Sequence, residues 1–365
     1  MATKTDRLFG GDAELEARFK HLISFSSDKR TMLVHMTNQC NLRCQDCWFY
    51  LEKFDEKNQE VREIERWRAF ARHEAERGTT VGLLIGGEPT LHPERIAAIR
   101  AEIPYITISS NGEIPLSRAD FPDTTVALTL FGGYQTDDKL RAIRSNGKRF
   151  SGLFQHVLEN YRYDPRAGFV YAVSFDAIDE IEETVKRIQD NGLRVLFNFY
   201  RDFTNHEVET EDQEMALLER TLEVKQKYPD VISTTPYMLE TMFVGRTHWG
   251  KFGYDSCPSI SCDFEGAKDR LSNGRPTLPG FNAYTASHDV TLCCTGGDCN
   301  TCRDSQAISS WIISNMRKYM KSPAHMRNWV EAAESYWSQF IWAPWHPHFN
   351  HTTEKEEKVE QIRYA

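Results

Sequence analysis

The sequence predicts an α/β protein whose core is a parallel sheet, either open or curled into part of a barrel. Two observations support this fold class. Short β-rich runs alternate with helical stretches between residues 31 and 205, and the runs are continuously apolar rather than alternating between apolar and polar residues. Continuous apolar runs are expected of parallel strands that are covered on both faces. Six such β-then-α units are typical of a parallel α/β sheet.

The elements follow one another regularly along this region. Residues 60–78 and 179–192 have helical periodicity, and each stretch ends at a glycine suited to a helix C-terminus. Ligands of parallel α/β sheets bind at the carboxyl ends of the strands, so the residues that follow each strand are the candidate site. The predicted strands are residues 32–36, 80–86, 105–110, 125–131, 169–175 and 194–200.

The rest of the chain divides by composition around this core. The final helical segment carries five tryptophans, and Trp311, Trp329 and Trp337 are interpreted as packing residues. Three histidines at 346, 348 and 351 lie in a Pro-rich turn and are not predicted to bind metal. The predicted divisions are an N-terminal extension at 1–30, the core at 31–205, a helical connector at 206–255, a Cys-rich module at 256–303 and a helical tail at 304–365.

Composition narrows the class of protein. The formal net charge is −9 and no basic tract occurs, which argues against duplex nucleic acid as a partner. The first 20 residues are polar, and no apolar run of about 18 residues follows, so neither a signal peptide nor a membrane span is predicted. The sequence therefore predicts a cytoplasmic protein, in which clustered cysteines more often hold metal than form disulfides.

The nine cysteines gather in two groups. Three of them, Cys40, Cys44 and Cys47, directly follow the first predicted strand at spacing C-x3-C-x2-C, and the other six lie between 257 and 302. Three thiolates without a close fourth ligand favour an iron–sulfur cluster with one open iron over a closed tetrahedral zinc site. On spacing alone, a zinc site completed by His35 or by a distant cysteine remains the alternative.

A second motif ends the second predicted strand. The sequence there is GGEP, where the glycines allow close backbone approach and Glu88 offers a carboxylate for an ammonium group. The C-x3-C-x2-C motif after strand one combined with GGEP after strand two resembles the radical S-adenosylmethionine (radical SAM) superfamily. The resemblance covers residues 31–205, and residues 136–160 resemble the family's connection after strand four.

The resemblance implies a partial (β/α)6 TIM-like barrel, a [4Fe–4S] cluster on Cys40, Cys44 and Cys47, and S-adenosylmethionine on the open iron. The family often has an aromatic residue before the third cysteine, whereas this chain has Asp46, followed after Cys47 by two aromatic residues. By analogy, the residues that contact S-adenosylmethionine are Gly86, Gly87, Glu88 and Pro89, then Ser109, Ser110 and Asn111 after strand three, with Ser174, Asn198, Trp48 and Phe49 as further candidates.

The second cysteine group loosely resembles the auxiliary-cluster modules called SPASM or twitch domains, and residues 288–293 resemble their strand-then-cysteine element. The spacing differs from a full SPASM pattern, so the resemblance implies one auxiliary [4Fe–4S] cluster; the alternative is a zinc knuckle. The two remaining thiols include a candidate hydrogen-atom donor, although a merely buried cysteine is the simpler interpretation. The predicted auxiliary ligands are Cys262, Cys293, Cys299 and Cys302, with Cys257 and Cys294 as alternates and as the candidate donors.

The resemblance implies an enzyme that reductively cleaves S-adenosylmethionine, with an electron donor such as flavodoxin or ferredoxin. The predicted substrate is a small polar metabolite of the sugar, aminoglycoside or nucleoside type in natural-product biosynthesis, which the enzyme would dehydrogenate, epimerise or cleave by radical elimination such as decarboxylation. One alternative is a peptide-modifying maturase that crosslinks or epimerises its substrate. The other is a non-enzymatic, zinc-stabilised binding scaffold.

Overall fold

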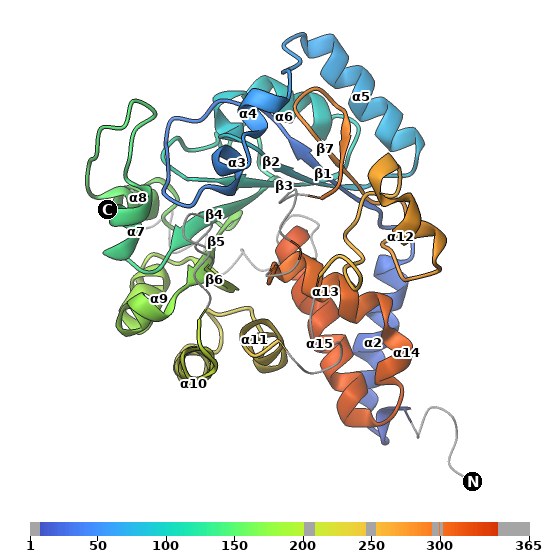
Figure 1. The fold of residues 1–365 in the computed structure, drawn as a ribbon. Coiled ribbons are helices and arrows are strands. Elements are labelled where there is room, and N and C mark those ends of the chain that lie inside the picture. Colours follow the sequence, from blue (N-terminus) through green and yellow to red (C-terminus); the bar gives the residue numbers. More distant parts are fainter. Residues whose placement is uncertain (1–7, 201–208, 246–252, 294–298, 300–301, 342–365) are drawn as a thin grey trace.

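The structure is a computed structural model that describes residues 8–200, 209–245, 253–293, 299 and 302–341. Its centre is an eight-stranded sheet with the order β6-β5-β4-β3-β2-β1-β7-β8 (Figure 1). All neighbouring strands run parallel except β7 and β8, which pair antiparallel. The strands are β1 (Thr31–His35), β2 (Val81–Ile85), β3 (Tyr105–Ser110), β4 (Thr125–Phe131), β5 (Ala167–Val173), β6 (Arg194–Phe199), β7 (Asn282–Tyr284) and β8 (Val290–Thr291).

The predicted fold class is confirmed: an unclosed, mostly parallel α/β sheet of the partial-barrel type. Strands β3 and β4 match their predicted ranges in full, and the other four predicted strands are displaced at their ends by one or two residues. Boundaries are set by hydrogen bonds with neighbours, which an apolar run alone does not determine.

Strands β7 and β8 extend the sheet beyond β1. Strand β8 lies within the 288–293 segment, where the resemblance implies a strand before a cysteine, whereas the three-residue β7 is not predicted by the sequence. Met32 of β1 pairs with Asn282 of β7, so the Cys-rich segment joins the sheet directly beside the first strand. This pairing brings the second cysteine group to the edge of the core.

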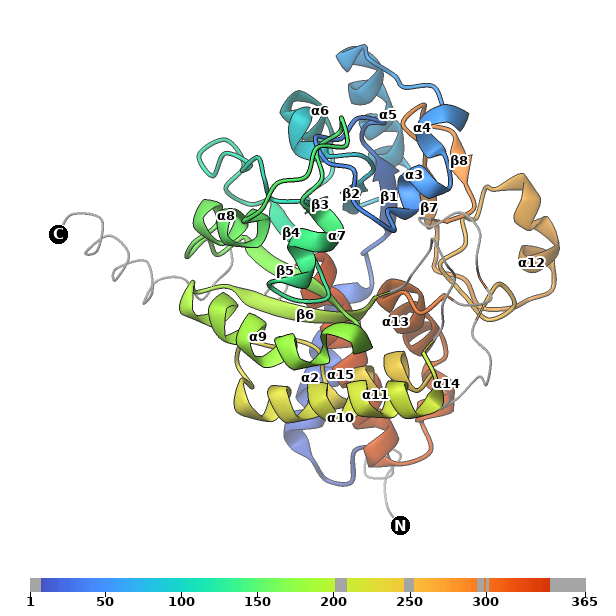
Figure 2. The ribbon, with the colours of Figure 1, turned by 60° about the vertical axis from the view of Figure 1, so that its left-hand side comes forward.

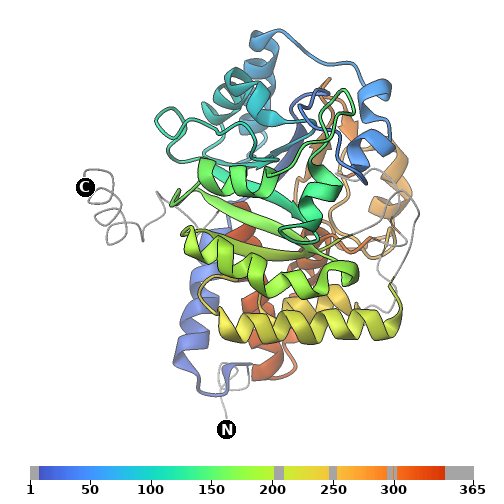
Figure 3. The same cartoon turned by 90° about the vertical axis from the view of Figure 1, so that its left-hand side faces the viewer.

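Helices cover the sheet and continue beyond it. Figure 2 shows α9 and α10 side by side next to β6, and Figure 3 shows α2 alongside the C-terminal helices. The two predicted helical stretches appear as α5 and α9, followed by Gly78 and Gly192, both at positive φ. The α-helices are α2 (Ala13–Ser26), α3 (Trp48–Leu51), α4 (Phe54–Lys57), α5 (Ile64–Glu76), α6 (Pro93–Arg100), α7 (Thr136–Arg141), α8 (Leu153–Asn160), α9 (Ile181–Asp190), α10 (Glu211–Lys227), α11 (Pro236–Phe243), α12 (Lys268–Ser272), α13 (Ser305–Ser314), α14 (Met316–Tyr319) and α15 (Pro323–Phe340).

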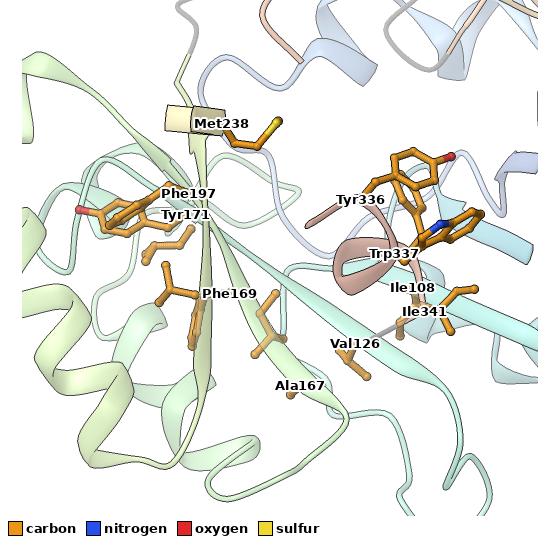
Figure 4. Close-up of a cluster of buried hydrophobic side chains, with 14 of the residues drawn as sticks. Ile108, Val126, Ala167, Phe169, Tyr171, Phe197, Met238, Tyr336, Trp337 and Ile341 are labelled. Atoms are coloured by element: carbon orange, nitrogen blue, oxygen red, sulfur yellow. The ribbon is translucent and has the colours of Figure 1, made fainter. Parts of the chain in front are cut away.

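The C-terminal helix α15 is part of the main hydrophobic core. Figure 4 shows a portion of this core, with aromatic residues from β5, β6 and α15. The end of α15 is tied to the sheet because the Thr107 hydroxyl donates to the carbonyl oxygen of Phe340 at 2.7 Å. The prediction that Trp311, Trp329 and Trp337 pack is confirmed, since all three are buried. Residues 346, 348 and 351 lie outside the described residues.

In the part of the chain that the structure describes, no helix is both long enough and apolar enough to cross a membrane.

Candidate functional site

The first cysteine group lies on a loop between β1 and α3. The loop is held by the connection that follows β4: the Arg43 amide donates to the carbonyl of Ile143 at 2.8 Å, and the Gln45 amide donates to that of Leu140 at 2.7 Å. Leu42, at the centre of the loop, is completely buried. Because two backbone bonds and one buried side chain anchor it, the loop holds its cysteines without needing regular secondary structure.

Each cysteine of this loop borders one cavity, and two of the sulfur atoms have polar neighbours. The Leu42 amide lies 3.4 Å from Cys40 Sγ, and Asn111 Nδ2 lies 3.7 Å from the same sulfur. Cys44 Sγ is 4.0 Å from the carbonyl oxygen of Arg141. The end of β3 and the end of α7 therefore meet the cysteine loop at its sulfur atoms.

Burial makes these thiols poor acids. Burial raises the pKa of Cys40 and Cys47 above the ordinary thiol value, and it raises the pKa of Cys44 to about 12. A buried thiolate needs a positive partner, and metal ligation by cysteine requires the thiolate. Binding of a metal cluster by this loop would therefore release protons.

The GGEP segment packs against the part of the cysteine loop that precedes Cys40. The Gly87 amide donates to Thr37 O at 2.8 Å, and the Glu88 amide donates to Gln39 O at 2.7 Å. Gly86 has φ of 120°, and a Cβ atom on Gly87 would lie 1.8 Å from the carbonyl oxygen of Gln39. The glycines are thus required for the contact between two loops of the chain itself.

Glu88 links the ends of β2 and β3. Its Oε1 accepts hydrogen bonds from the Thr90 amide and hydroxyl and from the Ser110 hydroxyl, at 3.1, 2.8 and 2.9 Å. Its Oε2 accepts one bond, from the Asn111 amide at 2.7 Å. Burial raises the pKa of Glu88 while these bonds oppose the rise. Oε1 therefore accepts three hydrogen bonds, whereas Oε2 accepts one and has a lone pair left for another donor.

A buried ion pair stands beside Cys44. Arg141 Nη1 lies 2.9 Å from an Asp137 carboxylate oxygen, and both side chains are almost fully buried. The Nε atom of Arg141 has no hydrogen-bond partner within the described residues, and the residue borders the cavity. A buried guanidinium with a spare donor suits an anionic ligand group. Arg141 is not predicted as a site residue, because nothing in the sequence distinguishes it from an arginine on the surface of a helix.

Asp46 differs from its neighbours in backbone conformation. It has φ of 57°, which aspartate tolerates better than most residues, and it is buried. Its Oδ2 accepts a hydrogen bond from the Tyr200 hydroxyl at 2.5 Å, just after β6. Tyr200 therefore brings an aromatic side chain to the cavity beside Asp46, the residue that precedes Cys47. Tyr200 follows β6 and is distant from Asp46 in the sequence. Trp48 and Phe49 also border the cavity.

These features surround a cavity of about 320 Å³ at the carboxyl ends of the strands. Its sheet side is bordered by small residues such as Ala127 and Ala172 together with larger ones such as Leu83 and Phe131. Pro89 and Ser174 are buried but do not border it. The sequence-predicted residues that do are Cys40, Cys44, Cys47, Trp48, Phe49, Gly86, Gly87, Glu88, Ser109, Ser110, Asn111, Asn198 and Cys302.

The second cysteine group surrounds a smaller cavity of about 30 Å³, bordered by Cys257, Cys293, Cys299 and Cys302. Cys302 borders both cavities. Cys262 does not border either one, and its Sγ lies 3.5 Å from the carbonyl oxygen of Leu278.

The structure therefore brings Cys257, rather than Cys262, together with the other three thiols. Cys294 lies outside the described residues.

Both cysteine groups suit an iron–sulfur cluster by their chemistry, since thiolates are its ligands. Among the described residues, no three His, Cys, Asp or Glu side chains converge closely enough to bind a single metal ion. Cluster thiolates bind separate iron atoms and need not converge on one point. Three thiolates, the tight glycine contact at Gly87 and the polar end of β3 fit a cluster at the larger cavity.

Comparisons with known proteins agree with this geometry. Residues 34–199 match the model of the radical SAM superfamily. A 133-residue region is 32% identical to Fe-coproporphyrin III synthase of Methanosarcina barkeri (strain Fusaro / DSM 804). That match covers 34% of this chain and 33% of the relative, so it spans about a third of the relative's length.

Two solved structures share the fold. Native anSMEcpe with bound AdoMet is 12% identical with a TM-score of 0.51, over 79% of this chain and 81% of that one. The same protein with bound AdoMet and Kp18Cys peptide is 13% identical with a TM-score of 0.50, over 80% and 82%. At these identities the likeness concerns the fold alone.

Proposed function

Because residues 34–199 belong to the radical SAM superfamily, whose members use a [4Fe–4S] cluster and S-adenosylmethionine, we propose that this enzyme abstracts hydrogen from a small polar metabolite. Cys40, Cys44 and Cys47 are the ligands assigned to the cluster. The observation that carries this assignment is that these three cysteines border the same cavity as Glu88 and Asn111.

Cys40, Cys44 and Cys47 would hold a cluster that, when bound, would supply the electron for reductive cleavage of S-adenosylmethionine, and the resulting 5′-deoxyadenosyl group would take a hydrogen atom from the substrate. The protein binds and orients these partners and excludes water. The side-chain nitrogen Nδ2 of Asn111, 3.7 Å from Cys40 Sγ, stabilises negative charge on that sulfur. The electron itself would come from a reduced flavodoxin or ferredoxin.

Two charged groups of the cavity suit the methionine part of S-adenosylmethionine. The Glu88 Oε2 lone pair is the acceptor for the methionine ammonium group, and the guanidinium of Arg141, a residue that borders the same cavity, suits the carboxylate. Asp137 holds the guanidinium in place. Ser109 and Asn198, which also border the cavity, are proposed to contact the rest of the molecule. Tyr200 offers its ring to the adenine, in place of the aromatic residue that is usual at the position of Asp46.

The auxiliary cluster is proposed at the smaller cavity. Cys257, Cys293, Cys299 and Cys302 border it together, which supports Cys257 as the ligand in place of Cys262. Burial raises the pKa of Cys257 well above the usual thiol value and that of Cys302 to about 12, so these thiols, like those of the first group, need a metal to become thiolates. Because Cys302 also borders the larger cavity, a cluster here would adjoin the substrate.

The test is anaerobic reconstitution followed by measurement of iron, sulfide and 5′-deoxyadenosine. We expect Cys44→Ala to abolish 5′-deoxyadenosine formation while Cys262→Ala retains it. Full 5′-deoxyadenosine formation by Cys44→Ala would overturn the proposal. Zinc in place of iron would instead support the binding-scaffold alternative.

Modification of a peptide is the second candidate function. It is favoured by the fold shared with anSMEcpe, which was solved with a bound peptide. Sugars, nucleosides and peptides added separately to the reconstituted enzyme distinguish the two, because the true substrate raises 5′-deoxyadenosine formation and yields a product. Deuterium uptake from heavy water then separates epimerisation from oxidation.

A further inference from the structure

The C-terminal segment contributes its own wall to the large cavity. Besides Cys302, this wall consists of Asp304, Gln306 and Gln339, from the start of α13 and the end of α15. None of these three belongs to the radical SAM region 34–199. These three residues are therefore separate from those proposed to hold the first cluster and S-adenosylmethionine.

Gln306 is the unusual member of this wall. It is 5% exposed, and it borders both the large and the small cavity. Within the described residues its side-chain amide neither donates nor accepts a hydrogen bond. Its amide atoms are not among the fully enclosed polar atoms that lack a partner, so they keep some contact with accessible space. A donor and an acceptor held at a cavity in this way are suited to a bound molecule.

The neighbours of Gln306 are held in place. The Asp304 carboxylate accepts a hydrogen bond from the Ala307 amide at 3.1 Å and so caps α13. The Gln339 amide donates to the Ser305 hydroxyl at 3.3 Å, which joins α15 to α13. These contacts keep the wall rigid, so that a ligand meets a preorganised set of polar atoms.

The charges around the cavity favour one class of ligand. Among the described residues that border it, Arg141 is the single basic side chain, and it is already paired with Asp137. Three carboxylates border the same space, those of Asp46, Glu88 and Asp304. An anionic substrate would be repelled, whereas a neutral or cationic one is accommodated.

We propose that Gln306 is the main substrate-recognition residue, and that with Asp304 it binds the amino and hydroxyl groups of a neutral or cationic polar metabolite. This inference rests on the proposed function and names the substrate class for that site. The Gln306 side-chain amide can donate a hydrogen bond to a substrate hydroxyl and accept one from it. The Asp304 carboxylate can accept a hydrogen bond from an amine or from a second hydroxyl.

The test uses three matched sugars: glucosamine, glucose and glucuronate. Binding of each to the reconstituted enzyme, with S-adenosylmethionine present, is measured anaerobically by calorimetry. We expect glucosamine to bind most tightly and glucuronate most weakly. Gln306→Leu, of similar size, is expected to weaken glucosamine binding about tenfold. The matched control is Gln189→Leu, at an exposed position of α9, which is expected to change nothing.

Substrate-independent 5′-deoxyadenosine formation is measured on the same samples, and the control variant Gln189→Leu is expected to leave it unchanged. The inference is overturned if glucuronate binds best, if neither glucosamine nor glucose binds, or if Gln306→Leu binds all three sugars as the unmodified enzyme does. Absence of 5′-deoxyadenosine from the unmodified enzyme would overturn the proposed function instead, so the two failures are distinct.

Discussion

Gly87 lies against the carbonyl of Gln39 so closely that a Cβ atom at position 87 would be 1.8 Å from that oxygen. Gln39 immediately precedes the first cysteine of the cluster loop. The loop and the strand end are therefore positioned by one backbone contact that only glycine permits, and any side chain there must move the loop.

This contact predicts the effect of Gly87→Ala. We expect the variant to fold but to bind substantially less iron at the first site, because displacement of Gln39 carries Cys40 with it. Iron and sulfide content after reconstitution measures the effect. Gly11→Ala is the control, because no atom lies within 4 Å of the Cβ position of Gly11, although Gly11, unlike Gly87, has a positive φ. Equal iron content in the two variants would contradict the prediction.

A buried ion pair between Arg95 and Glu60 also supports the cysteine loop. Arg95 Nη1 donates at 2.7 Å both to the carbonyl of Met36 and to Glu60, whose Oε2 accepts from the Asn38 amide at 2.8 Å. The side chains of Arg95 and Glu60 are 4% and 11% exposed. Removing one partner leaves an uncompensated buried charge.

We therefore expect Glu60→Ala to lower the free energy of unfolding by about 3 to 5 kcal/mol. Urea denaturation of the metal-free protein measures this loss independently of the cluster. Glu65→Ala breaks the exposed pair with Arg68 and is expected to cost less than about 1 kcal/mol. Similar losses in both variants would show that the pair does not support the loop.

The second cysteine group offers a comparison between two cysteines of the same segment. Cys257 borders the small cavity with three other thiols, whereas Cys262 lies outside it. We expect Cys257→Ala to lose the iron of one cluster and Cys262→Ala to retain all of it, as measured by iron analysis and by electron paramagnetic resonance of the reduced protein. The reverse result would restore Cys262 as the ligand.

The packing of the His288 ring leads us to expect that the stability of the protein depends on pH. Its ring stacks on Phe70 at 4.4 Å and meets Trp67 edge-on at 4.4 Å. Burial, followed by the nearby cations Arg66 and Arg95, lowers the pKa of His288 to about 4 from an ordinary value of 6.5. The folded protein therefore keeps this ring neutral where the unfolded chain protonates it.

The direction of the pH effect follows from that difference. Above pH 6.5 the ring is neutral in both the folded and the unfolded state, so its titration does not change the free energy of unfolding with pH. As pH falls from 6.5 towards 4, the unfolded chain binds a proton that the folded protein does not, so stability decreases. We expect His288→Asn, which tolerates the positive φ, to be less stable but to lose this part of the slope. An unchanged slope between pH 6.5 and 4 would refute it.

The strands of the core and the place of the first site follow from the amino-acid sequence. Parallel strands buried on both faces appear as continuous apolar runs, and β3 and β4 could be located to the residue. The cysteine spacing and the GGEP motif are local patterns of the chain. The cysteines, glycines and glutamate that border the large cavity can therefore be identified from the amino-acid sequence alone.

The tertiary structure alone decided which distant side chains meet. Cys257 lies with Cys293 and Cys302 at one cavity, in a region held by contacts between distant residues: the Ser261 amide donates to the carbonyl of Leu292 at 3.0 Å, and the Ser259 hydroxyl donates to the Ser310 hydroxyl at 3.0 Å. No local pattern encodes these contacts. Arg141, Tyr200 and Gln306 likewise look like ordinary polar residues of helices and strand ends in the sequence. Their position at a shared cavity results from packing between distant segments, and periodicity along the chain contains no information about that packing.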